Sequence, residues 1–580
     1  MFDCPGAGLS DIKMQKKWKF NSINLMNKLI GIMLFTILVL FSQRLTAETH
    51  PELESIIKCG TFMPDSERIA LNQRLHINVL RSGMQKAYPS KLGKFLIHYD
   101  TTGINAVPLE DNDSNGIPDY IDMTAYYFDY AYKVEVDSMG YLPPPADDML
   151  GGSDAYDVYC LDIGNNPNGI GYYGLTFKDT DQEKKSYIEI DNNFSPLDSM
   201  ILSSGKKRTF KDTGMAALKI TAAHEFHHGI QYAYGAKPES HSFFAEMTST
   251  WMEYRVYPDT KDYMQYVNDL FRFPYLFPFG TNEGDKGYYW SLFCQYINNN
   301  YGERPVKRLW ELIAKSESGY TALDSALIES GSGLVSNWCK FLPWLYYTGS
   351  RSIEGKYFDH AEEFPEIRVD TLKFSKPSIM MSGTTKSFQI KSYKCILPVP
   401  QPDQKPDELD IITSNTDLFS AIKNIASNKE YDLCIAQSPA AGFRQLGNTS
   451  YYYQFTPKTG DVVDSVFFSN GELISANITA FPNPYLNKKY NVLYFPVPKS
   501  AGLNDIAVLT VLTSDMAVIF SNNISVTEFK KDNNTNIRVL RWNASENSLP
   551  VSLNDLASGP YIFTVKFKED TIIGKFLVQH

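Results

Sequence analysis

The chain has 580 residues and a formal net charge of −11, and 43% of its residues are hydrophobic. At about 100–200 residues per domain, this length predicts roughly three or four domains. The hydrophobic content excludes a chain that is disordered throughout. The acidic balance argues against a nucleic-acid-binding protein, because the phosphate groups would be repelled.

The N-terminus has the parts of a secretory signal peptide. A lysine-rich flank precedes the apolar run Leu29–Phe41, and the small residue Ala47 follows it. This run is shorter than the roughly 20 apolar residues that span a bilayer. We therefore expect a cleaved signal peptide over residues 1–47 and no stable membrane span after its removal, with an uncleaved anchor as the alternative. The product is expected to be secreted or held at the cell surface.

The cysteines are spread along the chain. One of the 7 cysteines, Cys4, would leave with the signal peptide. The others form no CxxC pair, which argues against a cysteine-ligated metal or a thioredoxin-like site. In an oxidising compartment they could form disulfides, whose pairing the sequence does not resolve.

Strands and then helices are expected in the first part of the mature chain. A charged, helical segment is expected over residues 48–93, as a propeptide or as an integral part of the fold. Segments rich in β-branched and aromatic residues predict strands at 94–100, 157–163 and 186–191. Helical periodicity and stop signals predict helices at 214–234, 242–257 and 288–301. Strands followed by helices predict an α+β domain over residues 94–370.

The remainder of the chain is expected to be rich in strands. Alternating patterns predict a β-rich domain over residues 371–475, in which the proline-rich stretch 398–406 is a loop or linker. Short strands at regular spacing over residues 476–580 are typical of an immunoglobulin-like β-sandwich.

The sequence His224-Glu-Phe-His-His228 is an HExxH motif within the predicted helix 214–234. Residues four positions apart lie on one face of a helix, so His224 and His228 can bind one ion. Glu225 lies beside them, where a carboxylate can take a proton from the attacking water. His227 points about 100° away from His228 and is expected to pack or to form a hydrogen bond. Catalytic zinc typically takes three protein ligands, so a third is expected elsewhere.

The third ligand has several candidates downstream. A metzincin would carry a glycine and a histidine where this chain has Gln231 and Tyr234, so that arrangement is excluded. The remaining candidates are Glu246, Glu253 and His241. The two glutamates are about two turns apart and share a helical face, whereas His241 lies nearer the preceding loop.

Around these residues the chain resembles the gluzincin class of metallopeptidases, which includes thermolysin. In that class a glutamate on the following helix supplies the third zinc ligand, amid small and aromatic residues, and the segment around Glu246 has this pattern. The resemblance implies Zn²⁺ bound by His224, His228 and Glu246. Glu253 would then hold a histidine or support packing.

More narrowly, the chain resembles a bacterial group of secreted metallopeptidases over roughly residues 55–350. The segments that carry this resemblance are His224–Gln231, Thr248–Glu253 and His98–Gly103. Members of the class use a tyrosine or histidine to stabilise the oxyanion, and Tyr288 or Tyr289 could do so here.

An aspartate-rich loop has the twelve-residue spacing of a calcium-binding loop, with Gly116 at its sharp turn. The predicted Ca²⁺ ligands are Asp111, Asp113, Asn115, Asp119, Asp122 and the carbonyl group of Ile117. Aspartate in place of glutamate at the last position shortens that arm. We expect a structural calcium ion, and a polar turn without metal is the alternative.

The C-terminal residues 476–580 resemble the sorting domain of type IX secretion. The motifs are Phe481-Pro-Asn-Pro484, Ser558–Phe563 and Gly574–Phe576. This resemblance implies a Gram-negative bacterium, whose secretion machinery would bind the domain. A β-sandwich that binds a surface or a substrate is the alternative.

Together these features predict a secreted zinc metallopeptidase that hydrolyses a protein or peptide substrate, with Glu225 as general base. One alternative is the same site acting on a non-peptide amide or ester. The other is a non-catalytic adhesin that keeps a structural metal site. Glu225 favours an enzyme, because a structural site has no use for that carboxylate.

Overall fold

The computed structural model describes residues 83–580 with short gaps. The gaps are residues 167–170, 180–183, 203–204, 281–283, 316, 374–377, 397–407, 417, 423–428, 438–443, 447–448, 458–463, 469–472, 476–479, 481, 483–484, 487–488, 499, 514–516, 531–535, 545–549, 569 and 580. Four sequence predictions lie wholly or mostly outside the described residues: the signal peptide, the segment 48–93, the linker 398–406 and the Phe481–Pro484 motif.

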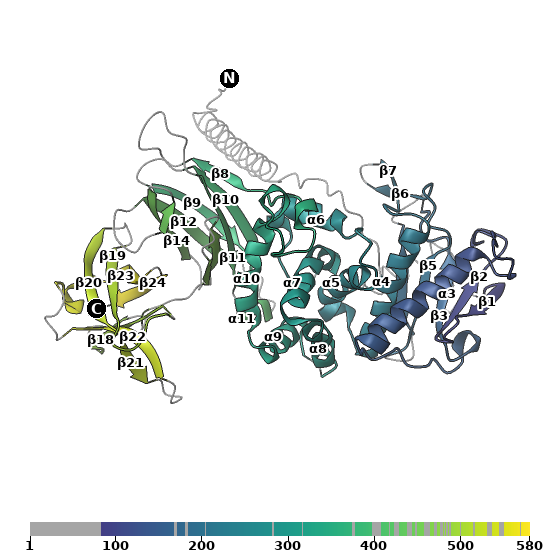
Figure 1. The fold of residues 1–580 in the computed structure, drawn as a ribbon, viewed down its shortest axis with the longest axis horizontal. Helices are drawn as coiled ribbons and strands as arrows, with labels where there is room; N and C mark the ends of the chain where they lie inside the picture. The colour runs from purple at the N-terminus through teal and green to yellow at the C-terminus, as the bar shows by residue number, and fades with distance from the viewer. Residues whose placement is uncertain are drawn as a thin grey trace, which may run out of the picture. The chain divides into compact units, whose positions relative to one another are not determined.

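The first described elements form a five-stranded mixed sheet in the order β1-β2-β3-β5-β4 (Figure 1). Its strands are β1 (Lys86–Pro89), β2 (Phe95–Tyr99), β3 (Tyr156–Leu161), β4 (Gly174–Lys178) and β5 (Ser186–Asp191). The central strands β2, β3 and β5 run parallel and confirm the three predicted strands, whereas β1 and β4 pair antiparallel at the two edges. Parallel pairing places the carboxyl ends of β3 and β5 at the same edge of the sheet.

Two long helices pack against this sheet and against each other (Figure 1). The first, α3 (Asp119–Tyr132), continues as the π-helical segment η1 (Lys133–Ser138), and the second is α4 (Met215–Ala233). A third helix, α5 (Pro238–Val256), packs on α4. The predicted helix 214–234 is confirmed. The predicted helix 242–257 begins earlier, because Pro238 occupies its first turn, where proline needs no N–H partner.

Further helices and turns complete the α-helical part. They are α6 (Met264–Arg272), η3 (Pro274–Leu276), η4 (Gly284–Trp290), α7 (Ser291–Tyr301), α8 (Arg304–Ile313), α9 (Gly319–Glu329), α10 (Leu334–Tyr346), η5 (Gly349–Arg351) and η6 (Ala361–Glu363). The predicted α-helix 288–301 begins at Ser291, because the preceding residues form the tighter 3₁₀ turn η4. Before α4, η2 (Leu150–Gly152) and the hairpin β6 (Ser199–Leu202)–β7 (Gly205–Arg208) lie on connecting segments.

Two sheets follow the helices, in the orders β16-β15-β11-β10-β8 and β13-β14-β12-β9. Their elements are β8 (Asp370–Lys373), β9 (Ser378–Thr385), β10 (Ile390–Ile396), β11 (Glu408–Asn415), α11 (Leu418–Ile422), β12 (Lys429–Gln437), β13 (Arg444–Leu446), β14 (Thr449–Pro457), β15 (Asp464–Phe468) and β16 (Leu473–Ser475). The strand-rich character predicted for residues 371–475 is therefore present.

The C-terminal residues form two further sheets, β17-β24-β23-β19-β20 and β18-β22-β21. Their elements are β17 (Tyr485–Leu486), β18 (Val492–Pro496), β19 (Ile506–Thr513), β20 (Val518–Ser525), β21 (Thr527–Lys530), β22 (Asn536–Asn543), η7 (Leu553–Asp555), β23 (Gly559–Phe567) and β24 (Asp570–Gln579). Buried residues from both sheets share one core, in which the rings of Phe495 and Phe563 lie 4.9 Å apart. Two sheets facing one core are a β-sandwich.

The α+β class is confirmed by this combination of helices and sheets. None of the helices in the described part of the chain is both long and apolar enough to cross a membrane. Cys160, Cys294 and Cys339 are buried and form no disulfide within the described part of the chain.

Candidate metal centre

Helix α4 carries the HExxH motif in the interior of the protein. The helix begins after Gly214, whose φ of 57° favours glycine, and the chain leaves it at Gly235, with a φ of 85°. Because α4 lies between the mixed sheet and α5, nearly all of its side chains are buried. His224, Glu225 and His228 are at most 2% exposed.

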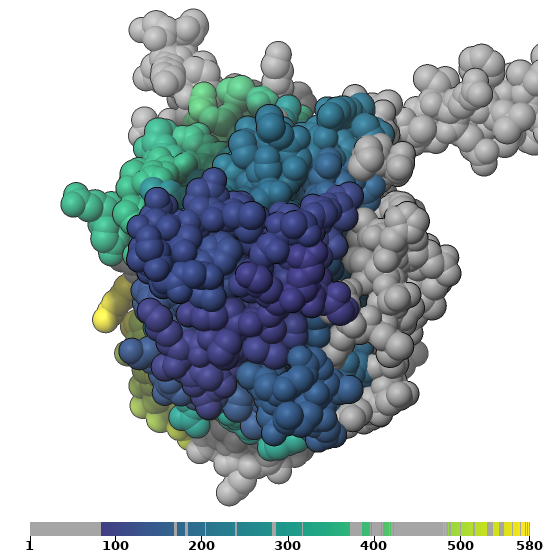
Figure 2. Space-filling view, turned by 90° about the vertical axis from the view of Figure 1, so that its right-hand side faces the viewer, coloured from purple at the N-terminus to yellow at the C-terminus, as the bar shows by residue number. Residues whose placement is uncertain are grey.

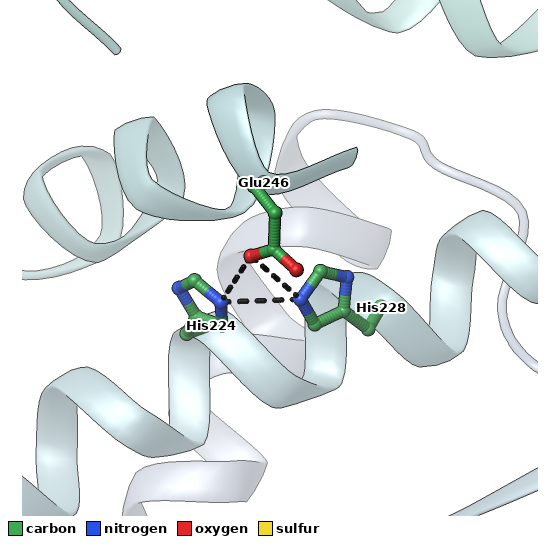
Figure 3. A group of neighbouring side chains, drawn as sticks. All are labelled: His224, His228 and Glu246. Carbon is green, nitrogen blue, oxygen red and sulfur yellow. Dashed lines mark hydrogen bonds and ion pairs between the residues drawn. The ribbon is translucent and has the colours of Figure 1, made fainter. Parts of the chain in front are cut away.

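The structure brings His224, His228 and Glu246 together, as predicted for a metal site (Figure 3). The two histidines extend from α4 and Glu246 extends toward them from α5. The two Nε2 atoms are 3.1 Å apart, and Oε2 of Glu246 lies 3.2 Å from Nε2 of His224 and 3.4 Å from Nε2 of His228. Three ligand atoms of the types that zinc prefers therefore face one point.

The opposite nitrogen of each histidine is held by a second side chain. Nδ1 of His224 lies 2.8 Å from Oε1 of Glu253, and Nδ1 of His228 lies 2.7 Å from Oε1 of Gln231. Such partners orient a histidine so that Nε2 faces the metal. Glu253 thus has the supporting position expected for it, and Gln231 is a supporting residue that sequence reasoning missed. Its place three residues after His228, on the same helical face, was the available signal.

Gln231 also joins the two helices that carry the ligands. Its Nε2 atom donates to the carbonyl oxygen of Ala245 at 3.0 Å and lies 3.1 Å from Oγ1 of Thr248 and 3.0 Å from Oγ of Ser249. These residues flank Glu246 on α5. One buried amide therefore fixes His228 relative to the helix that supplies the carboxylate.

The pKa values at the centre favour a proton on His224 and a charged carboxylate on Glu246. Burial alone would lower the pKa of His224, but Glu246 and Glu253 outweigh it and raise the pKa to about 10. Burial alone would raise the pKa of Glu246, but His228 and His224 lower it to about 2. A cation bound among these groups would take the place of that proton.

Glu225 faces the edge strand β4. Its Oε2 atom accepts a hydrogen bond from the hydroxyl of Thr176 at 2.7 Å, and the same hydroxyl lies 3.0 Å from the carbonyl oxygen of Glu225. A Cβ atom at Gly174 would lie 2.6 Å from Cγ of Glu225 and 2.8 Å from Cγ2 of Thr221. The strand therefore reaches α4 closely only because residue 174 is glycine.

Replacing Gly174 by alanine is expected to displace Glu225 while leaving the three metal ligands in place. The added methyl group overlaps Glu225, and such overpacking typically costs about 1–3 kcal/mol of stability. We expect a reduced unfolding temperature and an unchanged content of any bound metal, with a lower rate of any reaction in which Glu225 is the predicted general base. Gly83→Ala is the matched control, because a Cβ atom there would meet nothing within 4 Å. Full activity of a folded Gly174→Ala protein would contradict this account of Glu225.

The turn η4 packs on α5 beside the carboxylate ligand. A Cβ atom at Gly287 would lie 2.2 Å from the carbonyl oxygen of Phe243 and 2.9 Å from Cβ of Glu246, so glycine is required there. The next residue, Tyr288, stacks on His224 with ring centroids 5.7 Å apart. Tyr289 instead stacks on Phe277 at 3.9 Å. Tyr288, one of the two predicted oxyanion tyrosines, therefore lies against a predicted zinc ligand.

His227 and His241 lie outside the group of three ligands. Nδ1 of His227 lies 2.8 Å from Oε2 of Glu135 in η1, and neither side chain is exposed. Burial raises the pKa of Glu135 and lowers that of His227, which favours the neutral form of each side chain. His241 accepts from the backbone N–H of Lys237 at 3.1 Å. Among the described residues, the group around the HExxH motif that could hold a metal ion contains Glu246 and neither of these two histidines.

The aspartate-rich loop also has a defined geometry. Carboxylate oxygens of Asp111, Asp113 and Asp119 lie within 4.8 Å of one another. The backbone N–H groups of Asn115 and Gly116 donate to Asp111, and Gly116 has a φ of 85°. This loop belongs to the first described segments, coloured purple, which form much of the face turned to the viewer in Figure 2.

The other predicted calcium ligands occupy the second half of the loop. The Asn115 amide donates to Oδ2 of Asp122 at 2.8 Å, so Asp122 contacts the site through Asn115 and is not one of the three converging carboxylates. Ile117 donates its N–H to Oδ1 of Asn115 at 2.7 Å, and the role of its carbonyl group stays a prediction. Asp119 begins α3, and with Asp122 it places negative charge at the positive end of the helix dipole.

Comparisons with known proteins add little to this geometry. A model described as "Family of unknown function (DUF6055)" matches residues 210–326, which include α4 and α5. No curated protein matches the chain. Among solved structures, the neural ectodermal development factor IMP-L2 aligns over 36% of this chain and 89% of its own, at 11% identity and a TM-score of 0.08. A TM-score this low carries no argument about the fold. The chain is thus similar, over residues 210–326, to a family whose function is unknown.

Proposed function

We propose that this protein is a secreted zinc metallopeptidase whose metal ligands are His224, His228 and Glu246. One observation carries the proposal: three buried ligand atoms lie 3.1–3.4 Å apart, on two helices that other buried side chains hold in register. Neither the family match nor the structural neighbour bears on this function.

The spacing of the ligand atoms fits a tetrahedral zinc ion. Bonds of about 2.0–2.1 Å place neighbouring ligand atoms of a tetrahedral ion about 3.3 Å apart. Two imidazole nitrogens and one carboxylate oxygen suit zinc better than calcium or magnesium, which prefer oxygen ligands. Three protein ligands are typical of catalytic zinc, whereas structural zinc sites usually have four.

When bound, the zinc ion would make a water more acidic and polarise the carbonyl group under attack. Glu225 is one residue from His224 and is 1% exposed, so its carboxylate can accept the proton of the attacking water. The Thr176 hydroxyl donates a hydrogen bond to one carboxylate oxygen of Glu225 and so fixes the orientation of that carboxylate. After attack, Glu225 would pass the proton to the leaving amine, which returns the carboxylate to its starting state.

The buried state of the site bears on how a substrate would reach it. His224, Glu225, His228 and Glu246 are at most 3% exposed. A substrate would therefore approach the metal from the side that the three ligands leave open. That residues 48–93 are a removed propeptide stays a prediction.

Other parts of the chain support export. The signal-like residues 1–47 and the resemblance of residues 476–580 to a type IX sorting domain support a bacterial protein that is secreted or kept at the cell surface. The β-sandwich of the C-terminal residues is the architecture expected for such a domain. We also propose a structural Ca²⁺ ion in the loop 111–122.

The proposed function is tested by metal removal. Prolonged dialysis against a chelator should abolish cleavage of casein or gelatin, and addition of about one equivalent of Zn²⁺ should restore it. Small ester substrates assayed in parallel separate a peptidase from an esterase. A metal-loaded protein that cleaves neither class of substrate would instead support the adhesin alternative.

A further inference from the structure

Three carboxylates that belong to neither predicted metal site meet at one edge of the mixed sheet. Asp162 directly follows β3, Asp191 is the last residue of β5, and Asp198 directly precedes β6. Leu161 and Asp191 are register partners on the parallel strands β3 and β5, so the two strands end side by side. One carboxylate oxygen from each aspartate lies within 4.8 Å of the other two.

The charges of this group are not balanced by basic side chains. No ion pair among the described residues includes Asp162, Asp191 or Asp198. Asp198 is only 8% exposed, and its Oδ2 atom has no hydrogen-bond partner. Burial raises the pKa of Asp191 to about 7 and that of Asp198 to about 6. A buried carboxylate oxygen without a donor, next to two more carboxylates, is an arrangement that a cation would satisfy.

The position of Asp191 is fixed by backbone groups. Its Oδ1 atom accepts from the N–H groups of Asn193 at 3.0 Å and Phe194 at 2.6 Å, and its Oδ2 atom accepts from Gly164 at 2.8 Å. A Cβ atom at Gly164 would lie 2.7 Å from that Oδ2 atom, so glycine permits the close approach. Asp191 is therefore held in one orientation before any ion binds.

We propose that Asp162, Asp191 and Asp198 bind a calcium ion, at a site separate from the loop 111–122. The donors are all oxygen atoms, which excludes a preference for zinc or copper and favours a hard cation. Calcium accepts varied ligand geometries at about 2.3–2.6 Å, whereas magnesium requires near-octahedral geometry at about 2.0–2.1 Å. Three carboxylates on separate connecting segments suit the less demanding ion.

This site would connect the sheet to the helix that carries the HExxH motif. The carbonyl oxygen of Phe194 accepts from the N–H of Gly214 at 2.9 Å, and Gly214 immediately precedes α4. The hydroxyl of Tyr120, in the first turn of α3, donates to the carbonyl oxygen of Asp191 at 2.5 Å. Bound calcium would therefore stabilise the start of α4 and the start of α3. This proposal does not depend on peptidase activity.

Calcium binding by the full exported chain tests the proposal. The protein is freed of calcium with a chelator, and bound ⁴⁵Ca²⁺ is measured by equilibrium dialysis for wild type, Asp113→Asn, Asp198→Asn and the double variant. We expect each single variant to bind about one ion fewer than wild type and the double variant to bind none. Asp198→Asn that binds as much calcium as wild type overturns the proposal.

Thermal unfolding separates a metal ligand from a residue that only supports the fold. A bound ion stabilises the folded state by mass action, so calcium should raise the unfolding midpoint of Asp113→Asn, which keeps this site, by roughly 5 °C and that of wild type by more. In Asp198→Asn, most of the calcium-dependent rise in the unfolding midpoint that comes from this site should be lost. In chelator, the same variant should unfold at or above the wild-type midpoint. Equal destabilisation of Asp198→Asn with and without calcium contradicts the proposal.

Two further variants complete the design. Asp137→Asn, at an exposed position of η1, is the control and should bind calcium as wild type does. Should Asp198→Asn fail to fold, the half-buried Asp162→Asn carries the test with the same expected loss of one ion. Tighter binding of Mg²⁺ than of Ca²⁺ at this site would overturn the choice of ion.

Discussion

Glu225→Gln is expected to bind zinc as wild type does and to lose hydrolysis by roughly 10²–10⁴-fold, the usual contribution of a general base. The amide keeps the size of the side chain and can still contact the Thr176 hydroxyl, which lies 2.7 Å from the present carboxylate. It cannot take a proton from water. The measurement is casein cleavage at equal zinc content, with zinc determined by mass spectrometry on the same preparation.

The control for this substitution is Glu354→Gln, which makes the same chemical change at an exposed position. It should leave both activity and zinc content unchanged. A Glu225→Gln protein that cleaves casein as well as wild type would show that Glu225 is not the base. Loss of zinc together with activity would instead assign Glu225 a role in holding the site.

Glu246→Ala is expected to lower the zinc content from about one ion per chain to well below one, because catalytic zinc depends on three protein ligands. Oε2 of Glu246 is the only carboxylate oxygen that lies near the Nε2 atoms of both histidines among the described ion pairs. Without it, two histidines on one helix remain. Metal analysis by mass spectrometry after dialysis measures the difference directly.

Glu253→Gln serves as the comparison, because Glu253 contacts Nδ1 of His224, on the far side of the ring from the ligand nitrogen. Loss of such a supporting contact typically weakens metal binding by about 10–100-fold, so zinc should remain at saturating concentration. The reverse result, in which Glu253→Gln loses zinc and Glu246→Ala keeps it, would exchange the roles of the two glutamates. Retention of zinc by both variants would direct attention to His241.

The parts of the site that could be predicted from sequence are those set by helical periodicity. His224 and His228 face one direction because they are four residues apart on a helix, and α4 forms where predicted. Glu246 was chosen over Glu253 only through the resemblance to gluzincins, since both share one helical face. The structure separates them: Glu246 lies near Nε2 of His224, and Glu253 lies near Nδ1.

The contacts that could not be predicted depend on how strands and helices pair. Thr176 reaches Glu225 only because β4 pairs antiparallel with β5 at the edge of the sheet and packs on α4. Asp162 and Asp191 meet because β3 and β5 are parallel neighbours. Neither fact is encoded in a local pattern, because sheet order and register arise from long-range packing. The same holds for β1 and β4, which are edge strands whose place depends on their partners.

The deep burial of the three proposed zinc ligands would affect how quickly a bound metal exchanges with solvent. With His224, His228 and Glu246 at most 3% exposed, a chelator would displace these ligands only when the surrounding chain opens locally. The rate of metal loss would then be limited by the frequency of that opening and would become independent of chelator concentration. An enzyme of this kind would retain its zinc during brief passage through a metal-poor environment, even where equilibrium favours release.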